Sequence, residues 1–188
     1  MKADAQAPGQ VLERFRDYLS LLARLHMDPR LQGKIDLSGV VQQTLLDAYK
    51  AFGPFQQLPP NEQAAWMRRV LANNLKDEVR KLGAAVRNVG REISLEAALE
   101  NSSGHLEAWL TQELSSPSQH AIRSEELLRL AQALARLPED QRRAVELHHL
   151  SGMPVAEVSA HMGRSPGAVG ALLVRGLKKL RRLMHESE

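Results

Sequence analysis

The sequence predicts an all-α protein with two small helical domains joined by a flexible linker, the C-terminal one containing a helix-turn-helix. Three observations support this fold class. Apolar residues recur with helical spacing along most of the 188 residues, and no segment alternates as a strand does. Aromatic residues make up only 4% of the chain, which suits small cores of Leu, Val and Ala. Runs rich in Ser at 101–104 and 115–118 interrupt the helical pattern, as linkers do.

The N-terminal domain is expected at residues 10–92, after a disordered start at 1–9. Its first helix covers about 10–26, and Asp28-Pro29 ends it. A second helix is expected at 38–52, with one apolar face made of Val40, Val41, Thr44, Leu45, Ala48 and Phe52. Proline and glycine between residues 53 and 60 predict a rigid loop, and Asn61 can cap a long helix that reaches about residue 82.

The linker is expected at 93–120, with short helices at 94–100 and 105–114. The C-terminal domain, 121–188, opens with helices at 122–136 and 139–150, separated by Leu137-Pro138. Two further helices, 154–162 and 166–185, are separated only by Gly163, Arg164 and Ser165. Such a short turn forces two helices to cross steeply, as in DNA-binding helix-turn-helix motifs.

The last helix has a distinct outward face. Ser165 can cap it and Pro166 suits its first position. Its inward stripe is Val169, Leu172, Leu173, Leu177, Leu180 and Leu183. The opposite face is small at its start and basic at its end, which suits close approach to a groove followed by phosphate contacts. The predicted DNA-binding residues of this unit are Arg164, Ser165, Gly167, Gly170, Ala171, Val174, Arg175, Lys178 and Arg182. The alternative is an amphipathic helix whose charges only keep it solvated.

The charge is unevenly distributed along the chain. Residues 1–92 carry 14 Lys and Arg against 10 Asp and Glu, residues 121–188 carry 11 against 8, and residues 93–120 carry 4 acidic and no basic residues. Two basic domains therefore flank an acidic connector, whose charge repels DNA.

Several function classes find no support in the sequence. The chain has no cysteine, hence no disulfide and no cysteine-based zinc site. His148, His149 and His161 lack the spacing of a metal-binding helix, and no strand carries a phosphate loop, so we expect no metal, no cofactor and no enzyme activity. No apolar run reaches the ~18 residues of a membrane span, and the first residues lack the apolar core of a signal peptide. We expect a cytoplasmic protein without membrane insertion.

Three blocks, in order, resemble those of extracytoplasmic-function (ECF) sigma factors of bacteria. The first is IDLSGVVQQTLLDAYKAF at 35–52, the second AWMRRVLANNLKDEVR at 65–80, and the third the helix-turn-helix region at 137–184. In this family the first block binds core RNA polymerase, the second recognises and opens the minus-ten promoter element, and the third reads the minus-thirty-five element. The resemblance implies promoter DNA and core polymerase as partners, and such factors often also have an anti-sigma factor.

The resemblance also assigns residues. The polymerase-binding residues it implies are Asp36, Val40, Gln42, Gln43 and Asp47. The minus-ten residues, most of them cations along one helix, are Arg68, Arg69, Asn73, Lys76 and Arg80. Trp66 has the spacing of a core residue, with base stacking as the alternative, and Asp77 and Arg80 can simply pair with each other.

The sequence departs from the family pattern in both domains. Gly39 and Gln43 stand where acidic residues are usual, which removes two carboxylates from the polymerase-binding face. Gly167 and Gly170 cost the recognition helix roughly 1 kcal/mol each. The competing hypothesis is a helix-turn-helix regulator that binds DNA without acting through the polymerase core.

Overall fold

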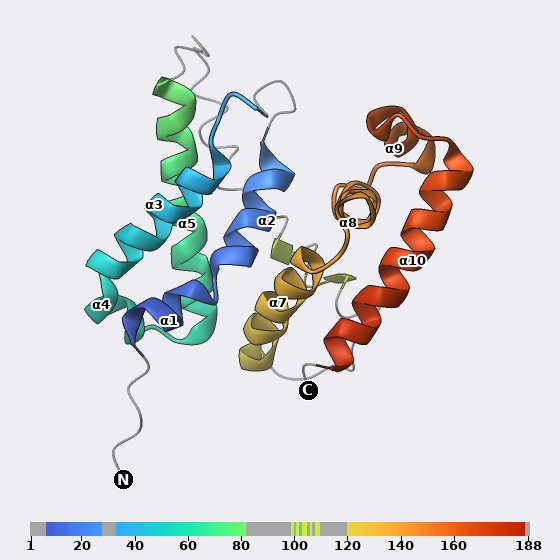
Figure 1. Cartoon of the computed structure of the whole chain (residues 1–188). Helices are drawn as coiled ribbons and strands as arrows, with labels where there is room; N and C mark the ends of the chain where they lie inside the picture. The colour runs from blue at the N-terminus through green and yellow to red at the C-terminus, as the bar shows by residue number, and fades with distance from the viewer. Residues whose placement is uncertain are drawn as a thin grey trace.

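The computed structural model describes residues 7–27, 33–81 and 120–186, together with Leu99, Asn101, Ser103, Gly104, Leu106, Ala108 and Trp109. Every element within this described part is helical, which confirms the all-α class (Figure 1). No helix of the described residues is long and apolar enough to cross a membrane. The expected disordered start was wrong at its end, because Pro8 and Gly9 begin the first helix, Pro8–Glu13. Residues 1–6 and most of the expected linker, with its short helices at 94–100 and 105–114, lie outside the described residues.

The N-terminal half gathers its aromatic residues into one cluster. Its helices are α1 (Pro8–Glu13), α2 (Arg16–His26), α3 (Leu37–Lys50), α4 (Phe52–Gln56) and α5 (Pro60–Lys81). Phe55 is 1% exposed, and its ring meets the edges of Phe15 at 5.8 Å and Trp66 at 5.5 Å between centroids. Phe52 lies 6.3 Å from it, so all three phenylalanines of the chain pack together.

Two expectations for this half were wrong in detail. The helix expected at 10–26 is interrupted at Arg14 and Phe15, because the chain turns there to bury the Phe15 ring against Phe55. The first part of the loop expected between residues 53 and 60 instead belongs to α4, which holds Phe55 in the core. Neither change follows from local propensity, since tertiary packing of one aromatic ring causes both.

The start of α3 explains the glycine at position 39. Asp36 is the N-cap of α3, and its Oδ1 accepts a 3.0 Å hydrogen bond from the Gly39 backbone N–H. A Cβ at position 39 would lie 2.7 Å from Asp36 Oδ2. Any side chain there must displace the capping carboxylate, so glycine fits a cap of this geometry.

The C-terminal half contains α7 (His120–Ala135), α8 (Glu139–Val145), a π-helical turn η1 (Glu146–Leu150), α9 (Val155–Met162) and α10 (Pro166–His185). The expected bounds of α10 are confirmed, and α9 begins one residue later than expected. The helix expected at 139–150 does not stay α-helical, since its last turn widens to η1. Single π-turns of this kind occur frequently at functional sites.

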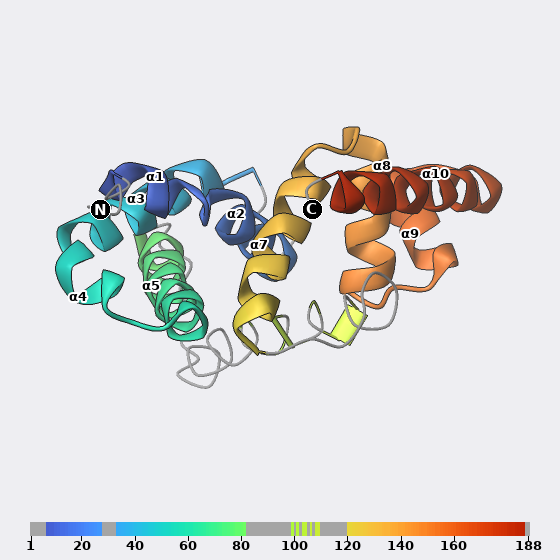
Figure 2. The ribbon, with the colours of Figure 1, turned by 90° about the horizontal axis from the view of Figure 1, so that it is seen from below.

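The two halves pack against each other through α7. This helix contacts α2 and α5 on one side and α10 on the other, while α8 packs on α10. Both views show α7 between the N-terminal helices and the helix-turn-helix (Figures 1 and 2). The described core is therefore continuous from Leu12 to Leu183.

Candidate nucleic-acid interface

The turn between α9 and α10 has the geometry that the sequence predicts. Gly163 ends α9 in the left-handed region, at φ 63°, where glycine is favoured over residues with a side chain. Ser165 Oγ accepts a 3.3 Å hydrogen bond from the Ala168 N–H, and Pro166 is the first helical residue of α10. The predicted capping is confirmed, and α10 leaves the turn in a defined direction.

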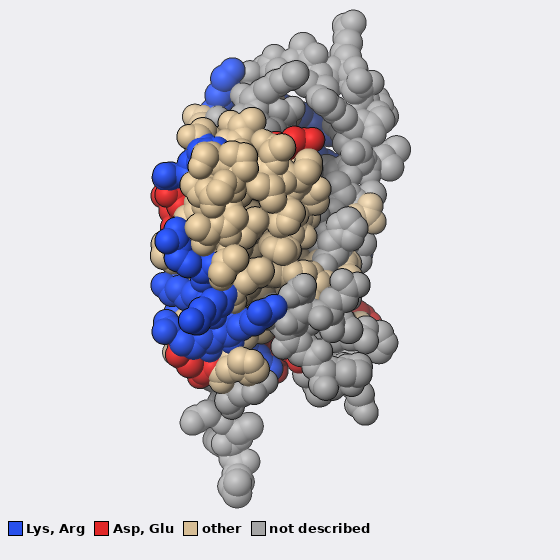
Figure 3. All heavy atoms as spheres, turned by 90° about the vertical axis from the view of Figure 1, so that its right-hand side faces the viewer, with Lys and Arg blue, Asp and Glu red and all other residues tan. Residues whose placement is uncertain are grey.

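The outward face of α10 is small at its start and basic towards its end. Its buried side is Val169, Leu172, Leu173, Gly176, Leu180 and Leu183, with Leu177 half-buried. The predicted contacts Gly167, Ala171, Val174, Arg175, Lys178 and Arg182 are exposed, whereas Gly170 is half-buried. In Figure 3, Lys and Arg gather along one edge and the lower part of this face, beside an uncharged area. Val174 is 68% exposed, available to an apolar contact such as a thymine methyl.

Arg164 is held by another helix. Its Nη2 donates to Asp140 Oδ2 of α8 at 2.5 Å, and both side chains are about half exposed. This pair ties the helix-turn-helix turn to the first turn of α8. A phosphate must compete with the Asp140 carboxylate for the Arg164 guanidinium. Arg164 can therefore contact DNA only if this ion pair is weakened.

Gly176 is a structural residue that sequence reasoning missed. It is buried where α10 crosses α8, and a Cβ there would lie 3.0 Å from Val145 Cγ2 and 3.4 Å from the Gln141 carbonyl oxygen. At Gly167 and Gly170 a Cβ meets nothing within 4 Å. The sequence position of Gly176 could have indicated its burial, because it lies seven residues after Val169 and four before Leu180, on the inward stripe.

The cations of α5 do not share one environment. Arg68 is 8% exposed, and its Nη1 donates to Tyr18 Oη at 3.0 Å and to Ser103 Oγ at 3.2 Å. Arg69, Asn73 and Arg80 are exposed and Lys76 is half-buried. Four of the five predicted minus-ten residues therefore reach the surface, whereas the structure places Arg68 in the interior.

Trp66 belongs to the core, as its spacing predicted. It is partly buried against the core and packs edge-on against Phe55, with ring centroids 5.5 Å apart. Asp77 and Arg80 pair at 3.3 Å, so the intrahelical alternative is also realised. Both side chains are about 60% exposed, and such a pair contributes little to stability.

The outward face of α3 combines polar and apolar side chains. Gln42 and Gln43 are exposed, Asp36 caps the helix, and Val40 is 3% exposed within the core. Asp47 accepts hydrogen bonds from Gln43 Nε2 at 2.9 Å, Asn74 Nδ2 at 3.2 Å and Lys50 Nζ at 3.4 Å.

Sequence reasoning also missed two exposed apolar side chains on α3. Leu46 is 48% exposed and Tyr49 is 56% exposed, three residues apart on the side away from the core. The buried stripe itself could have shown this, because a helix that buries Val41, Thr44, Leu45 and Ala48 must turn positions 42, 46 and 49 outwards.

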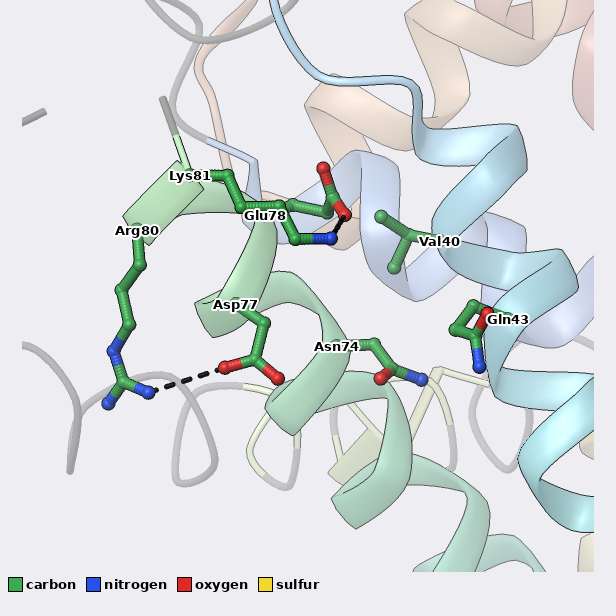
Figure 4. Close-up of a pocket in the computed structure, with 7 residues that line it drawn as sticks. All are labelled: Val40, Gln43, Asn74, Asp77, Glu78, Arg80 and Lys81. Atoms are coloured by element: carbon green, nitrogen blue, oxygen red, sulfur yellow. Dashed lines mark hydrogen bonds and ion pairs between the residues drawn. The ribbon is translucent and has the colours of Figure 1, made fainter. Parts of the chain in front are cut away.

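A pocket of about 500 Å³ lies between α3 and α5 (Figure 4). Val40 and Gln43 line it from α3, and Asn74, Asp77, Glu78, Arg80 and Lys81 line it from α5. Gln43 and Asn74 extend towards each other across it, while Arg80 turns outwards to Asp77. The Glu78 carboxylate accepts from Lys81 Nζ at 2.6 Å and raises the pKa of that ammonium group. The lining of the pocket therefore includes Val40 and Gln43, two of the predicted polymerase-binding residues, and Arg80, one of the predicted minus-ten residues.

The histidine pair of η1 serves packing. His149 stacks on Trp109 with centroids 5.5 Å apart, and His148 Nδ1 lies 2.7 Å from the Met153 carbonyl oxygen. Among the described residues, no group of three or more His, Cys, Asp or Glu side chains could hold a metal.

Comparison with known proteins finds similarity to sigma factors. Residues 127–180 match the family model described as "Sigma-70, region 4". The chain is 29% identical to RNA polymerase sigma factor CarQ of Myxococcus xanthus, over 94% of this chain and 97% of that protein. It is 27% identical to RNA polymerase sigma factor CnrH of Cupriavidus metallidurans, over 95% and 87%. It is 28% identical to the ECF RNA polymerase sigma-E factor of Escherichia coli K12, over 74% and 69%.

These similarities support an ECF-type sigma factor. The matched region 4 covers the end of α7, all of α8, η1 and α9, and most of α10. The helix-turn-helix thus lies inside the matched region, apart from the last residues of α10. The match to CarQ extends over nearly the whole chain, so the resemblance also includes α3 and α5.

Proposed function

We propose that three different helices of this chain bind the upstream promoter element, the minus-ten element and core RNA polymerase. The chain binds core RNA polymerase and directs promoter-specific initiation of transcription. The observation that supports this function best is a region 4 helix-turn-helix with an exposed basic face, at the end of a chain similar to sigma factors over nearly all its length. The helix-turn-helix regulator that acts without polymerase is therefore disfavoured.

The upstream surface is the outward face of α10. We propose residues 121–188 as the C-terminal domain, with Ala171 and Val174 towards the groove and Arg175, Lys178 and Arg182 on phosphates. The open space around Gly167 and Gly170 supports close approach of the helix start. The small side chains make phosphate contacts the main source of affinity here, and such contacts carry little sequence information.

The minus-ten surface is proposed on α5, within an N-terminal domain of residues 10–92. Arg69, Asn73, Lys76 and Arg80 form this set, since all four have accessible side chains. Arg68 is left out, because it is buried between Tyr18 and Ser103. A positive track is what captured single-stranded bases require.

The polymerase-binding surface is proposed on α3. Asp36, Gln42, Gln43 and Asp47 remain in it, and Leu46 and Tyr49 replace the buried Val40 as its apolar component. Exposed apolar side chains among polar ones are typical of protein interfaces. We propose that these apolar contacts compensate for the two carboxylates that are absent from the polymerase-binding surface because Gly39 and Gln43 stand in their positions. We further propose that the chain acts in the cytoplasm and has no catalytic activity of its own.

A reconstituted transcription assay tests the function. Purified chain, core RNA polymerase and a promoter library are combined, and the transcripts are sequenced. We expect the chain to associate with core polymerase and to produce transcripts from a defined promoter set. A two-fold symmetric DNase footprint without polymerase, and no directed transcripts, would favour the regulator hypothesis. Leu46→Ala with Tyr49→Ala is expected to reduce polymerase association, while binding to an upstream-element duplex stays unchanged.

A further inference from the structure

The first half of α10 carries no side chain that can form a hydrogen bond. Residues 166–174 read PGAVGALLV, so the first polar side chain of the helix is Arg175. Ser165, just before them, uses its Oγ to accept the 3.3 Å hydrogen bond that caps the helix. In a helix-turn-helix, the N-terminal residues of the second helix are those that contact base edges. The polar groups of the bases therefore find no side-chain partner among residues 166–174.

Packing within the chain does not account for the glycines of this segment. A Cβ at Gly167 or Gly170 would meet nothing within 4 Å, in contrast to Gly176, where it would lie 3.0 Å from Val145 Cγ2. Glycine inside a helix also lowers the stability of that helix relative to alanine. The two open glycines instead let the α10 backbone come close to another surface.

Two apolar side chains project from the same face of the helix. Ala171 is exposed, and Val174 is 68% exposed. Among the described residues of the C-terminal half, Val174 is the one large apolar side chain that is exposed. The surface beside the Lys and Arg side chains is uncharged (Figure 3). An apolar side chain is thus placed on the part of α10 that would enter a DNA groove.

The major groove offers an apolar side chain one kind of partner. Each base pair presents hydrogen-bond donors and acceptors there, and the one apolar group is the C5-methyl of thymine. A valine placed against the polar edge of another base withdraws donors and acceptors from water without replacing their hydrogen bonds, which is unfavourable. The chemistry of Val174 therefore favours a base pair that contains thymine.

We propose that Val174, together with Ala171, reads thymine methyl groups at two neighbouring base pairs of the upstream element. This inference rests on the proposed function, because it names the bases that the assigned surface of α10 recognises. Side chains three residues apart on a helix are about 5–6 Å apart at Cβ, and successive bases of one strand are about 3.4 Å apart, which limits the two contacts to neighbouring pairs. Val174 is thus a specificity-determining residue, whereas Lys178 and Arg182 supply affinity through phosphates.

Replacement of thymine by deoxyuridine tests the contact, because it removes only the methyl group. A promoter obtained from the transcription assay is bound by the chain with core polymerase, and each thymine of its upstream element is replaced in turn. Competition with the unmodified promoter gives the relative affinity. We expect replacement at neighbouring base pairs to weaken binding about fourfold each, the effect of withdrawing one methyl group from an apolar contact. Equal affinity for every deoxyuridine duplex overturns the proposal.

5-Methylcytosine provides the converse test. A sensitive T·A pair is replaced either by C·G or by 5-methylcytosine·G, and these two pairs differ only in the methyl group at C5. We expect the methylated duplex to bind about fourfold more tightly than the unmethylated one. Equal affinity of the two duplexes contradicts the proposal, because recognition there would then follow the hydrogen-bonding groups of thymine.

Val174→Ala assigns the effect to this side chain. The position is exposed, so the fold should be kept, and circular dichroism checks this. In the variant we expect the preference for thymine over deoxyuridine to fall from about fourfold to below about twofold. Lys178→Ala is the matched control on the same face, since loss of a phosphate contact weakens binding of both duplexes and leaves their ratio unchanged. An unchanged ratio in Val174→Ala overturns the assignment.

Failure of the proposed function has a different signature from failure of this inference. A chain that selects no promoter with core polymerase fails before any base is replaced, and the inference fails with it. Promoters that are selected but show no methyl effect leave the proposed function intact and overturn this inference alone.

Discussion

Helices α5 and α10 carry similar runs of Lys and Arg, yet they use these residues in different ways. On α10 the cations Arg175, Lys178 and Arg182 lie outside a narrow apolar stripe and face solvent. On α5 the first cation of the run, Arg68, turns inwards and holds Tyr18 and Ser103. A basic helix therefore indicates a nucleic-acid surface only where the cations lie opposite the buried stripe.

The largest expected effect is on Arg68. Arg68→Ala should lower the free energy of unfolding by about 2–3 kcal/mol, because it leaves buried hydroxyl groups without a charged donor. Urea denaturation measures this, with Arg69→Ala as the exposed neighbour, expected within about 0.5 kcal/mol of the unmodified chain. A stable Arg68→Ala protein with weakened promoter opening would instead make Arg68 a DNA contact and remove the contrast with α10.

The glycines of α10 test its two faces separately. Gly176→Ala should lower stability by about 1–2 kcal/mol, because the added Cβ lies 3.0 Å from Val145 Cγ2, which must shift within the contact between α8 and α10. Gly170→Ala has open space and should raise stability by roughly 0.5–1 kcal/mol. Thermal denaturation distinguishes the two. Equal effects at both positions would contradict the inward and outward assignment of α10.

The basic end of α10 should act on DNA affinity rather than on stability. Lys178→Ala with Arg182→Ala is expected to weaken binding about tenfold across sequences and to reduce the salt slope by about 1.8, since two phosphate contacts are lost. Titrations at several salt concentrations with an upstream-element duplex give the slope. Lys34→Ala, an exposed cation in the other half, is the control. An unchanged slope would remove both residues from the interface.

The smallest effect on stability is expected for Arg80 on α5. Arg80→Ala breaks an exposed pair with Asp77 and should cost less than about 0.5 kcal/mol. If Arg80 contributes to the minus-ten surface, transcription should still fall, and heteroduplex templates opened in advance should partly restore it. No loss of transcription would indicate that the outward cations of α5 only solvate the helix.

Local signals in the sequence predicted the helix-turn-helix best. Ser165, Pro166 and a strict apolar period define α10, and the structure has the same bounds. The break at Phe15 and the short helix α4 were not predictable, because a distant aromatic contact causes both. The burial of Arg68 was not predictable either, because its partner Ser103 is 35 residues away in a segment expected to be a linker. Local chemistry is visible in one sequence, whereas long-range pairing is not.

The π-helical turn Glu146–Leu150 has a consequence for insertions and deletions in this region. A π-turn accommodates one residue more than an α-helical turn of the same rise. Removal of one residue from this turn would let α8 continue as a regular helix, and each residue of an α-helix adds about 100° of rotation and 1.5 Å of rise. The whole helix-turn-helix would then have a different orientation relative to α7. Chain length in these five residues thus sets the direction in which α10 points, independently of which side chains they carry.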